Sequence, residues 1–333
     1  MRIRRPFFPP LLVAALVAIG GMPVAQGQTG AWALIQTSGI PLRPGVVQGG
    51  SQVPLERAQG GDTPVLTFRS RQGAVRLLLD TGAATTMVTE ALVKRLGLTR
   101  LALAPQEFSM AGGGGDCPTL RLFRTQIPVL ELPGVAGRSG LRLEGSEALV
   151  IPGAGLPPGV DGLLGASALR QRPVLVDPVA EIVAMGPPAL EWRQTLPASP
   201  RNVPLTWRRS VPLLPLRIRP GAGGPAESVP ALADTGAEGV FLTPALARRL
   251  TPRQASQSAR LVGVCGVQDV RRQPLFGVAI GEAAHPQESV EAILLANPVF
   301  SLLGVEAIVG QALLGRHRQL WRLEADPPRL ELW

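Results

Sequence analysis

Two long stretches of the sequence follow the same order of apolar and polar positions. Residues 77–98, LLLDTGAATTMVTEALVKRLGL, run from an apolar strand through an Asp-Thr-Gly turn into an amphipathic helix. Residues 231–250, ALADTGAEGVFLTPALARRL, repeat this order. Aligning Asp80 with Asp234 pairs seventeen positions without a gap, and nine of them are identical. The sequence therefore predicts an internal duplication.

The same predicted elements flank each copy. Residues 65–80 read as two β runs joined by a short turn, and residues 213–234 repeat this plan around a longer Gly/Pro turn. Each aspartate is thus predicted to end the second strand of a hairpin. Downstream, Thr89 and Thr243 are placed to cap short helices, and Gly97 is placed to end the first of them.

A second pair of matching segments follows later in each half. Residues 162–185 and 308–332 both read as a buried apolar strand, a short helical piece and a closing pair of strands. A Pro-rich segment between them has the character of a linker. The predicted division is a signal peptide (1–27), an N-terminal extension (28–60), an N-terminal lobe (61–186), a linker (187–204) and a C-terminal lobe (205–333).

Composition supports two lobes built mainly from strands. A chain of 333 residues is long for one hydrophobic core and comfortable for two domains. With 45% apolar and 17% charged residues it lies in the globular range, and its 39 Gly and 34 Pro point to many turns and short elements. We expect an all-β architecture with a few short helices.

The N-terminus has the features of a secretory signal. It begins with basic residues, continues with an apolar run at 11–19, and reaches small residues at 25–27. The apolar run is short for a bilayer span, and no other segment is apolar enough to cross one. The predicted location is periplasmic or secreted, with no stable membrane span after cleavage; the alternative is an uncleaved N-terminal membrane anchor. Whether residues 28–60 form a removable cover, an interlobe strand or a tail stays open.

Charge and metal-ligand spacing exclude several classes of function. The net charge is +9, but the arginines are scattered, Lys94 is the only lysine, and no basic run is interleaved with aromatics, so nucleic-acid binding is not indicated. His285 and His317 have no neighbour at metal-ligand spacing and are interpreted as surface residues. No metal or cofactor is expected. Cys117 and Cys265 could form one bridge or remain free thiols, and both readings stay open.

The burial of two aspartates at strand ends has a free-energy cost that another interaction must offset. A buried, unpaired carboxylate costs several kcal/mol or takes up a proton. If the two copies face each other across a pseudo-twofold axis, Asp80 and Asp234 meet and can share one proton and one water. The following glycines would allow close approach of the backbone, and the threonine hydroxyls could hydrogen-bond across the junction.

These residues resemble the active site of aspartic proteases of the pepsin and retropepsin type, and specifically the single-chain, two-lobed retropepsin-like proteins of bacteria. The family's active-site motif is matched by Asp80-Thr81-Gly82-Ala83 and Asp234-Thr235-Gly236-Ala237. Its buried hydrophobic-hydrophobic-glycine motif is matched by Leu163-Leu164-Gly165 and Ile308-Val309-Gly310. The resemblance covers residues 60–333. It implies a bilobed pepsin/retropepsin-like fold, catalytic aspartates supported by the Thr, Gly and Ala that follow them, and a polypeptide substrate.

The resemblance also implies two β-hairpin flaps over the cleft. Residues 107–123 and 259–276 are the candidates. Their tips would be formed by Gly112, Gly113, Gly114, Gly263 and Gly266. The chain contains no tyrosine, whereas pepsin-like enzymes carry one on a flap, so two comparable flaps of the retropepsin style are favoured. Both cysteines fall in these segments, and a bridge between flaps would hinder substrate entry.

The function predicted from the sequence is that of an aspartic endopeptidase. The Asp80/Asp234 dyad would activate a water, and the two lobes of a monomer would act as an intramolecular dimer. Because alanine follows each motif glycine, no hydroxyl donates to the outer carboxylate oxygens, and a mildly acidic working pH is expected. Glu238, beside the second motif, is interpreted as solvent-facing. The alternative function is a secreted, non-catalytic peptide-binding or scaffold protein with the same fold.

Overall fold

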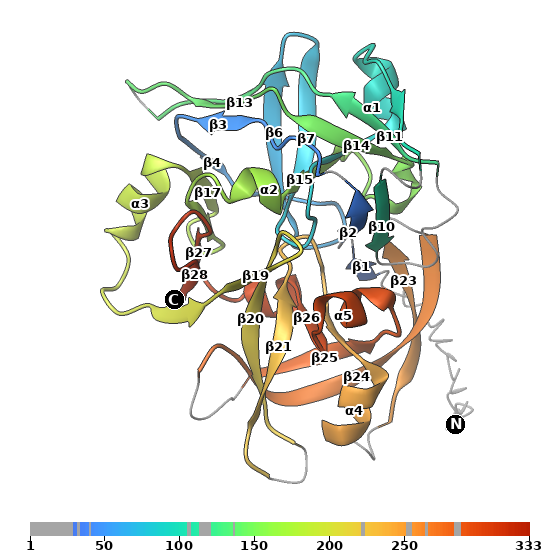
Figure 1. The fold of residues 1–333 in the computed structure, drawn as a ribbon. Coiled ribbons are helices and arrows are strands. Elements are labelled where there is room, and N and C mark those ends of the chain that lie inside the picture. The colour runs from blue at the N-terminus through green and yellow to red at the C-terminus, as the bar shows by residue number, and fades with distance from the viewer. Residues whose placement is uncertain are drawn as a thin grey trace, which may run out of the picture.

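The chain folds mainly into β-strands that form two large sheets and two smaller ones (Figure 1). The computed structural model describes residues 29–31, 34–39, 41–104, 108–112, 121–135, 137–220, 224–250, 255–263, 266–282 and 288–333. The predicted signal peptide, residues 1–27, lies outside these ranges. Among the described residues, no helix combines the length and the apolar character that a bilayer crossing requires.

The first large sheet has eleven strands from the N-terminal half of the chain. In spatial order its strands are β3 (Val46–Gln48), β13 (Leu141–Glu144), β12 (Leu130–Leu132), β6 (Pro64–Ser70), β7 (Gly73–Asp80), β15 (Gly162–Gly165), β8 (Met87–Thr89), β14 (Glu147–Ile151), β11 (Phe123–Gln126) and β9 (Leu101–Ala102), with β5 (Glu56–Arg57) paired to β6.

The second large sheet has nine strands, eight of them from the C-terminal half. In spatial order they are β1 (Thr29–Ala31), β23 (Gln257–Gly263), β24 (Gly266–Ile280), β25 (Glu288–Leu294), β22 (Val240–Leu242), β26 (Ala307–Val309), β21 (Glu227–Ala233), β20 (Val211–Ile218) and β19 (Thr206–Arg208).

The two large sheets repeat one topology, which confirms the internal duplication. In the first, the β6/β7 hairpin is followed in space by β15, β8 and β14; in the second, the β20/β21 hairpin is followed by β26, β22 and β25. The pairings agree in direction as well: β15 and β26 run parallel to the strand that leads to each aspartate. β8 and β22 then pair with them in the antiparallel direction. Each buried Gly-containing motif therefore lies beside its own Asp-Thr-Gly turn.

A six-stranded sheet joins the two halves. Its order is β18 (Arg201–Pro204), β28 (Arg329–Leu332), β27 (Gln319–Arg322), β16 (Val174–Asp177), β17 (Ile182–Met185) and β4 (Ser51–Pro54). The central pairing, β16 with β27, is antiparallel and connects one half of the chain to the other. A continuous apolar core runs through both halves and includes Leu77 and Leu79 from the first, and Leu214 and Ala231 from the second.

Short helices connect the strands, as the sequence predicts. They are α1 (Glu90–Arg95), α2 (Ala166–Leu169), α3 (Pro187–Arg193), α4 (Pro244–Leu250), α5 (Pro298–Leu303), α6 (Gln311–Leu314) and a 3₁₀ turn at Gly153–Gly155. The predicted caps are present: the Oγ1 of Thr89 accepts from the N–H of Leu92, and the Oγ1 of Thr243 accepts from that of Leu246. Gly97 follows α1 with φ +64°, a conformation that glycine adopts without strain.

The segment at residues 187–204, expected to be a linker, contains regular structure. It forms helix α3 and the edge strand β18. The prolines at 187 and 188 occupy the first turn of α3, where a missing N–H costs no hydrogen bond. The indole N–H of Trp192 donates to Asp177 and ties the helix to the six-stranded sheet. The Pro-rich pattern marked a helix start here rather than an extended connection.

The N-terminal extension is built into the sheets. Strands β3, β4 and β5, within residues 46–57, pair with β13, β17 and β6. Farther upstream, β1 pairs in parallel with β23, and β2 (Leu34–Gly39) pairs antiparallel with β10 (Phe108–Gly112). Residues 46–57 are thus part of the fold, and residues 29–31 and 34–39 pair with strands from the two segments expected to be flaps.

We expect Thr89→Ala to destabilise the N-terminal half by about 1 kcal/mol, because the substitution leaves the first turn of α1 without its cap. Chemical denaturation at neutral pH measures this. Thr89→Ser, which keeps the hydroxyl, is the control and should unfold close to the wild type. Equal unfolding midpoints for the alanine variant and the wild type would contradict the role of the cap.

Candidate active site

Two aspartates lie at corresponding positions of the two large sheets. Asp80 is the last residue of β7 and pairs with Gly165 of β15. Asp234 directly follows β21, and its N–H donates to the carbonyl of Val309 at 3.0 Å. Neither side chain is exposed to solvent. The two carboxyl groups thus lie in the interior at the ends of apolar strands, as the sequence pattern predicts.

Each turn holds its own aspartate with two backbone donors. The N–H groups of Gly82 and Ala83 donate to Oδ1 of Asp80 at 2.8 and 2.9 Å. Those of Gly236 and Ala237 donate to Oδ1 of Asp234 at 2.9 and 3.1 Å. The Oδ2 atom of each aspartate is buried and has no hydrogen-bond partner within the described part of the chain. One oxygen of each carboxyl is therefore fixed and the other is available.

The two turns are joined by a reciprocal hydrogen-bond network between threonines. The N–H of Thr81 donates to Oγ1 of Thr235 at 3.0 Å, and the N–H of Thr235 donates to Oγ1 of Thr81 at 3.0 Å. Each hydroxyl then donates to a carbonyl of the opposite half, Thr81 to Ala233 and Thr235 to Leu79, both at 2.7 Å. These bonds fix the distance between the two aspartates across the junction.

The motif glycines bring the carboxyl groups face to face. A Cβ added at Gly82 would overlap the carboxyl carbon of Asp234, and one added at Gly236 would overlap that of Asp80. Each glycine backbone thus packs directly against the opposing carboxyl group. A side chain at either glycine would push the two aspartates apart, which explains why the turn requires this residue.

The electrostatics favour one shared proton. Burial raises the pKa of both carboxyls, and the negative charge of Asp234 raises that of Asp80 further, well above its ordinary range. The pKa of Asp234 is raised from 3.8 to about 6, mainly by burial, with its hydrogen bonds opposing the shift. Two like charges in contact cannot both be stable without solvent. The pair therefore retains one proton in mildly acidic solution.

Sequence reasoning missed Gln311, a buried residue beside the dyad. It is the first residue of α6, and its side-chain amide donates to the carbonyl of Thr235 at 2.7 Å. The corresponding residue of the other half is Ala166, whose N–H donates to the carbonyl of Ala83 but whose methyl side chain has no amide to donate. Because the two copies differ here, the repeat gave no signal for this contact.

The expectation that Glu238 faces solvent is wrong. Its carboxylate accepts from the N–H groups of Asp62 and Thr63 at 2.8 and 3.0 Å, and also from the Thr63 hydroxyl. The side chain is only partly exposed. It holds a loop of the N-terminal half against the second motif. These donors lie 175 or 176 residues away in sequence, so no local pattern indicated them.

The flap candidates are only partly described. Gly112 ends β10, where its carbonyl accepts from the side-chain amide of Asn297 at 2.9 Å. Gly263 and Gly266 face each other at the end of the β23/β24 hairpin. Gly113 and Gly114 lie outside the described residues, as do Cys117 and Cys265. Both β10 and β23 pair with the N-terminal segment, so this segment and the flap candidates lie together.

His317 is not a surface residue as expected. Its side chain is 12% exposed, and Nε2 lies 3.2 Å from a carboxylate oxygen of Glu288. His285 lies outside the described residues. Within the described ranges, no three His, Cys, Asp or Glu side chains are grouped so that they could hold a metal ion.

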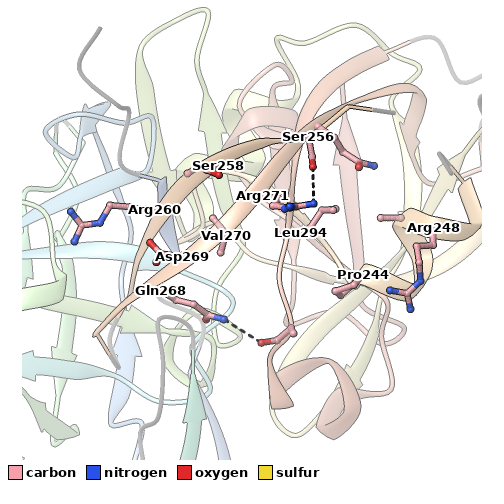
Figure 2. A pocket seen from close by; sticks show the side chains of 14 residues that line it. Pro244, Arg248, Ser256, Ser258, Arg260, Gln268, Asp269, Val270, Arg271 and Leu294 are labelled. Carbon is pink, nitrogen blue, oxygen red and sulfur yellow. Dashed lines mark hydrogen bonds between the residues drawn. The ribbon is translucent and has the colours of Figure 1, made fainter. Parts of the chain in front are cut away.

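One sizeable cavity lies away from the aspartates. It has a volume of about 860 Å³ and lies in the C-terminal half, between α4 and the β23/β24 hairpin (Figure 2). Its lining carries both signs of charge, including Arg248, Arg271 and Asp269. Arg271 donates to Ser256 across it at 3.5 Å. Neither motif aspartate lines this cavity.

We expect Thr235→Val to destabilise the protein by about 1–3 kcal/mol for each buried group that loses its partner, namely the Thr81 N–H and the Leu79 carbonyl. Calorimetry or denaturant unfolding measures the loss. Thr235→Ser keeps the hydroxyl and should restore most of the stability. Equal unfolding of the valine variant and the wild type would show that the threonine network does not hold the junction.

We expect Asp234→Asn to raise the melting temperature at pH 7.5 by a few degrees. Because the folded-state pKa is raised from 3.8 to about 6, the folded protein binds more protons than the unfolded chain in this window. Wild-type stability should therefore fall as pH rises from about 4 through about 6. The variant should lose this part of the dependence of stability on pH, and the melting temperatures of the two proteins should converge near pH 4. A variant that is less stable than the wild type at pH 7.5 would contradict the shared proton.

Comparison with known proteins relates this geometry to a family. Residues 66–168 match the family model described as aspartyl protease. No curated protein matches the chain significantly. Among solved structures, the chain is similar to conglutin gamma, described as a unique basic 7S globulin from lupine seeds, with 12% identity, a TM-score of 0.46, and coverage of 85% of this chain and 94% of that one. It is equally similar to basic 7S globulin from soybean, with 12% identity, a TM-score of 0.46, and coverage of 88% and 94%.

The family match covers the first motif, its hairpin and the Leu163-Leu164-Gly165 strand. The likeness to the two globulins is too loose to inform function. The mostly β, duplicated fold and the family match agree with the sequence prediction. The match over residues 66–168 therefore supports a relation to aspartyl proteases of the retropepsin-like type.

Proposed function

We propose that this protein is an aspartic endopeptidase that cleaves polypeptides through the Asp80/Asp234 pair. One observation carries the proposal: two buried carboxyl groups from equivalent turns face each other, and each keeps one oxygen without a protein partner. A pair that holds a single proton contains one general base and one general acid at the same place. A single chain supplies both groups, so a monomer is sufficient.

The proposed mechanism uses a water bound between the two Oδ2 atoms. The ionised carboxylate takes a proton from this water as the water oxygen attacks the peptide carbonyl carbon. The protonated carboxyl donates its proton to the carbonyl oxygen, giving a neutral tetrahedral intermediate. Collapse of the intermediate breaks the C–N bond: the carboxyl that took the water proton gives it to the amine nitrogen, and the other, now ionised, carboxylate takes a proton from one hydroxyl of the intermediate. The products are a carboxylic acid and an amine, and the pair again holds one proton. The backbone donors to Oδ1 keep both carboxyls oriented throughout.

The pH dependence follows from the raised pKa values. The single-proton state is lost when both carboxyls are protonated in strong acid, and when both are ionised at higher pH. Because burial raises the pKa of Asp234 to about 6, this state extends into mildly acidic solution. Ala83 and Ala237 provide no hydroxyl to stabilise the charged forms, which acts in the same direction.

The competing proposal is a non-catalytic binding or scaffold protein. It gives no reason to keep two like charges buried in contact, since replacing one by an uncharged residue would remove the electrostatic cost. The intact, oriented pair therefore favours the enzyme.

We expect the protein purified without residues 1–27 to cleave an unfolded protein substrate, with a rate maximum in mildly acidic solution and inhibition by pepstatin. Asp80→Asn and Asp234→Asn should each reduce cleavage by ~10²-fold or more, because each removes a proton-transfer group. Peptide products are measured by mass spectrometry between pH 3 and 8. Glu131→Gln, an exposed carboxylate of β12, is the control and should remain active. Cleavage that persists in both asparagine variants, or is absent at every pH, would overturn the proposal.

A further inference from the structure

The side chain of Gln311 distinguishes the second aspartate turn from the first. Gln311 begins α6, and its side-chain amide donates to the carbonyl of Thr235 at 2.7 Å. Gln311 is 3% exposed and Thr235 is not exposed at all, so water does not compete for this hydrogen bond. The bond therefore couples α6 to the turn that holds Asp234.

The start of α6 is anchored to the same turn by its backbone. The N–H of Gln311 donates to the carbonyl of Ala237 at 2.8 Å, and the N–H of Ala312 donates to the carbonyl of Glu238 at 2.9 Å. Because the backbone of Gln311 is held in this way, its side-chain amide meets the Thr235 carbonyl in a defined geometry.

The first aspartate turn lacks the side-chain bond. Ala166 occupies the equivalent position of α2, and its N–H donates to the carbonyl of Ala83 at 2.8 Å, as the N–H of Gln311 donates to that of Ala237. The methyl group of Ala166 cannot donate, and no side chain of the described residues donates to the carbonyl of Thr81. The two turns therefore share their backbone bonds and differ in this one amide.

The bond acts on a peptide unit that holds an aspartate. The Thr235 carbonyl and the N–H of Gly236 belong to the same peptide unit, and this N–H donates to Oδ1 of Asp234 at 2.9 Å. A hydrogen bond accepted by the carbonyl polarises the peptide unit and strengthens its N–H as a donor. A stronger donor to a carboxylate oxygen favours the ionised form of that carboxyl. Gln311 thus lowers the cost of negative charge on Asp234, and the first turn has no equivalent.

The pKa values of the pair point in the same direction. Burial raises the pKa of Asp234 to about 6, and its hydrogen bonds oppose the shift. Burial and the negative charge of Asp234 together raise the pKa of Asp80 well above its ordinary range. Asp234 is therefore the member of the pair that ionises more readily.

Charged side chains on the elements beside the pair are engaged elsewhere, so they do not account for this difference. The pKa shifts of the two aspartates arise mainly from burial, from each other and from the N–H groups of the turns. The neighbouring charges and their partners are Arg76 with Glu56, Asp161 with Arg95, Glu306 with Arg249, Arg316 and His317 with Glu288, Glu238 with the N–H groups of Asp62 and Thr63, and Arg170 with the ring of Trp207.

We propose that Gln311 is a positioning residue that assigns the roles of the two aspartates, by favouring the negative charge on Asp234 and leaving the shared proton on Asp80. In the proposed reaction, on which this inference rests, a lone pair of the water oxygen forms the new C–O bond while Asp234 takes the water proton. The π pair of the C=O bond moves to the carbonyl oxygen, which takes the proton of Asp80. Each substrate molecule then meets the base and the acid in the same places.

The test follows both titration steps of the pair after the amide is removed. Gln311→Met keeps a side chain of similar size without a donor, and Gln311→Ala reproduces the first half of the chain. Carbon-13 NMR of the aspartate carboxyl carbons reports the two steps, and the pH profile of kcat/KM reports them through its acidic and alkaline limbs.

We expect both variants to move the acidic step, and with it the acidic limb, upward by about 0.5 pH unit, because the charge on Asp234 loses stabilisation. The alkaline step, in which Asp80 loses the shared proton, should stay in place. In the wild type, the carboxyl carbon of Asp234 should show the larger chemical-shift change in the acidic step, and that of Asp80 in the alkaline step. This wild-type result tests the assignment even if a variant does not fold.

Gln319→Met is the matched control. Gln319 is buried in the same half, and its amide donates to the carbonyl of Leu314, the last residue of α6, at 2.8 Å. Its substitution should lower the melting temperature, because a buried carbonyl loses its donor, and should leave both titration steps in place. A purely structural Gln311 would give this same result in Gln311→Met.

The possible failures are distinguishable. Unmoved steps in both Gln311 variants, a shift in Gln311→Ala alone, or an equal shift in Gln319→Met would overturn the role of the Gln311 amide. A shift of the alkaline step, or a wild-type acidic step carried mainly by Asp80, would overturn the assignment of the proton. In each of these cases, cleavage by the wild type leaves the proposed function standing. If the acidic step moves as expected and the wild type cleaves no substrate, the assignment stands and the proposed function is wrong.

Discussion

The contact between two buried carboxyl groups is the constraint on which the rest of the structure depends. Full burial makes two negative charges at this place untenable, so the pair must hold a proton between them. Four backbone N–H groups fix one oxygen of each carboxyl, and the glycines leave no room for a side chain between the turns. The reciprocal threonine bonds then set the separation of the two halves. Each feature would lose its purpose if the aspartates were apart.

A duplicated scaffold surrounds this contact, but its flanks are not symmetric. The motif residues, the hairpins and the strands beside them repeat closely in the two halves. One residue beyond each motif, Ala84 and Glu238 differ. The glutamate accepts from the N–H groups of Asp62 and Thr63, whereas Ala84 lines a cavity of about 660 Å³. The repeated core thus holds the two aspartates together, and the residues directly beside it differ between the two halves.

Local sequence patterns predicted much of the fold, whereas side-chain contacts between distant residues were not predicted. The repeat around Asp80 and Asp234 indicated the duplication, the hairpins and the helix caps, because each follows from residues close in sequence. The facing of the aspartates was inferred from the repeat together with the cost of burying an unpaired carboxylate. The environments of Glu238 and His317 were misjudged because their partners are distant in the chain. The segment at 187–204 was interpreted as a linker, but it contains a helix, because Pro-rich composition is typical of both linkers and helix starts. Gln311 has no counterpart in the other copy, so the duplication could not reveal it.

The shared proton can be observed directly. Carbon-13 NMR of aspartate-labelled protein, with Asp80→Asn and Asp234→Asn used for assignment, follows the carboxyl carbons of both residues through a pH titration. The two carboxyls should titrate together, with one proton retained well above the ordinary aspartate value of 3.8, to about pH 6 or higher. Two independent titrations near 3.8, each unaffected by substitution of the other aspartate, would show that the carboxyl groups do not meet and would contradict the central claim.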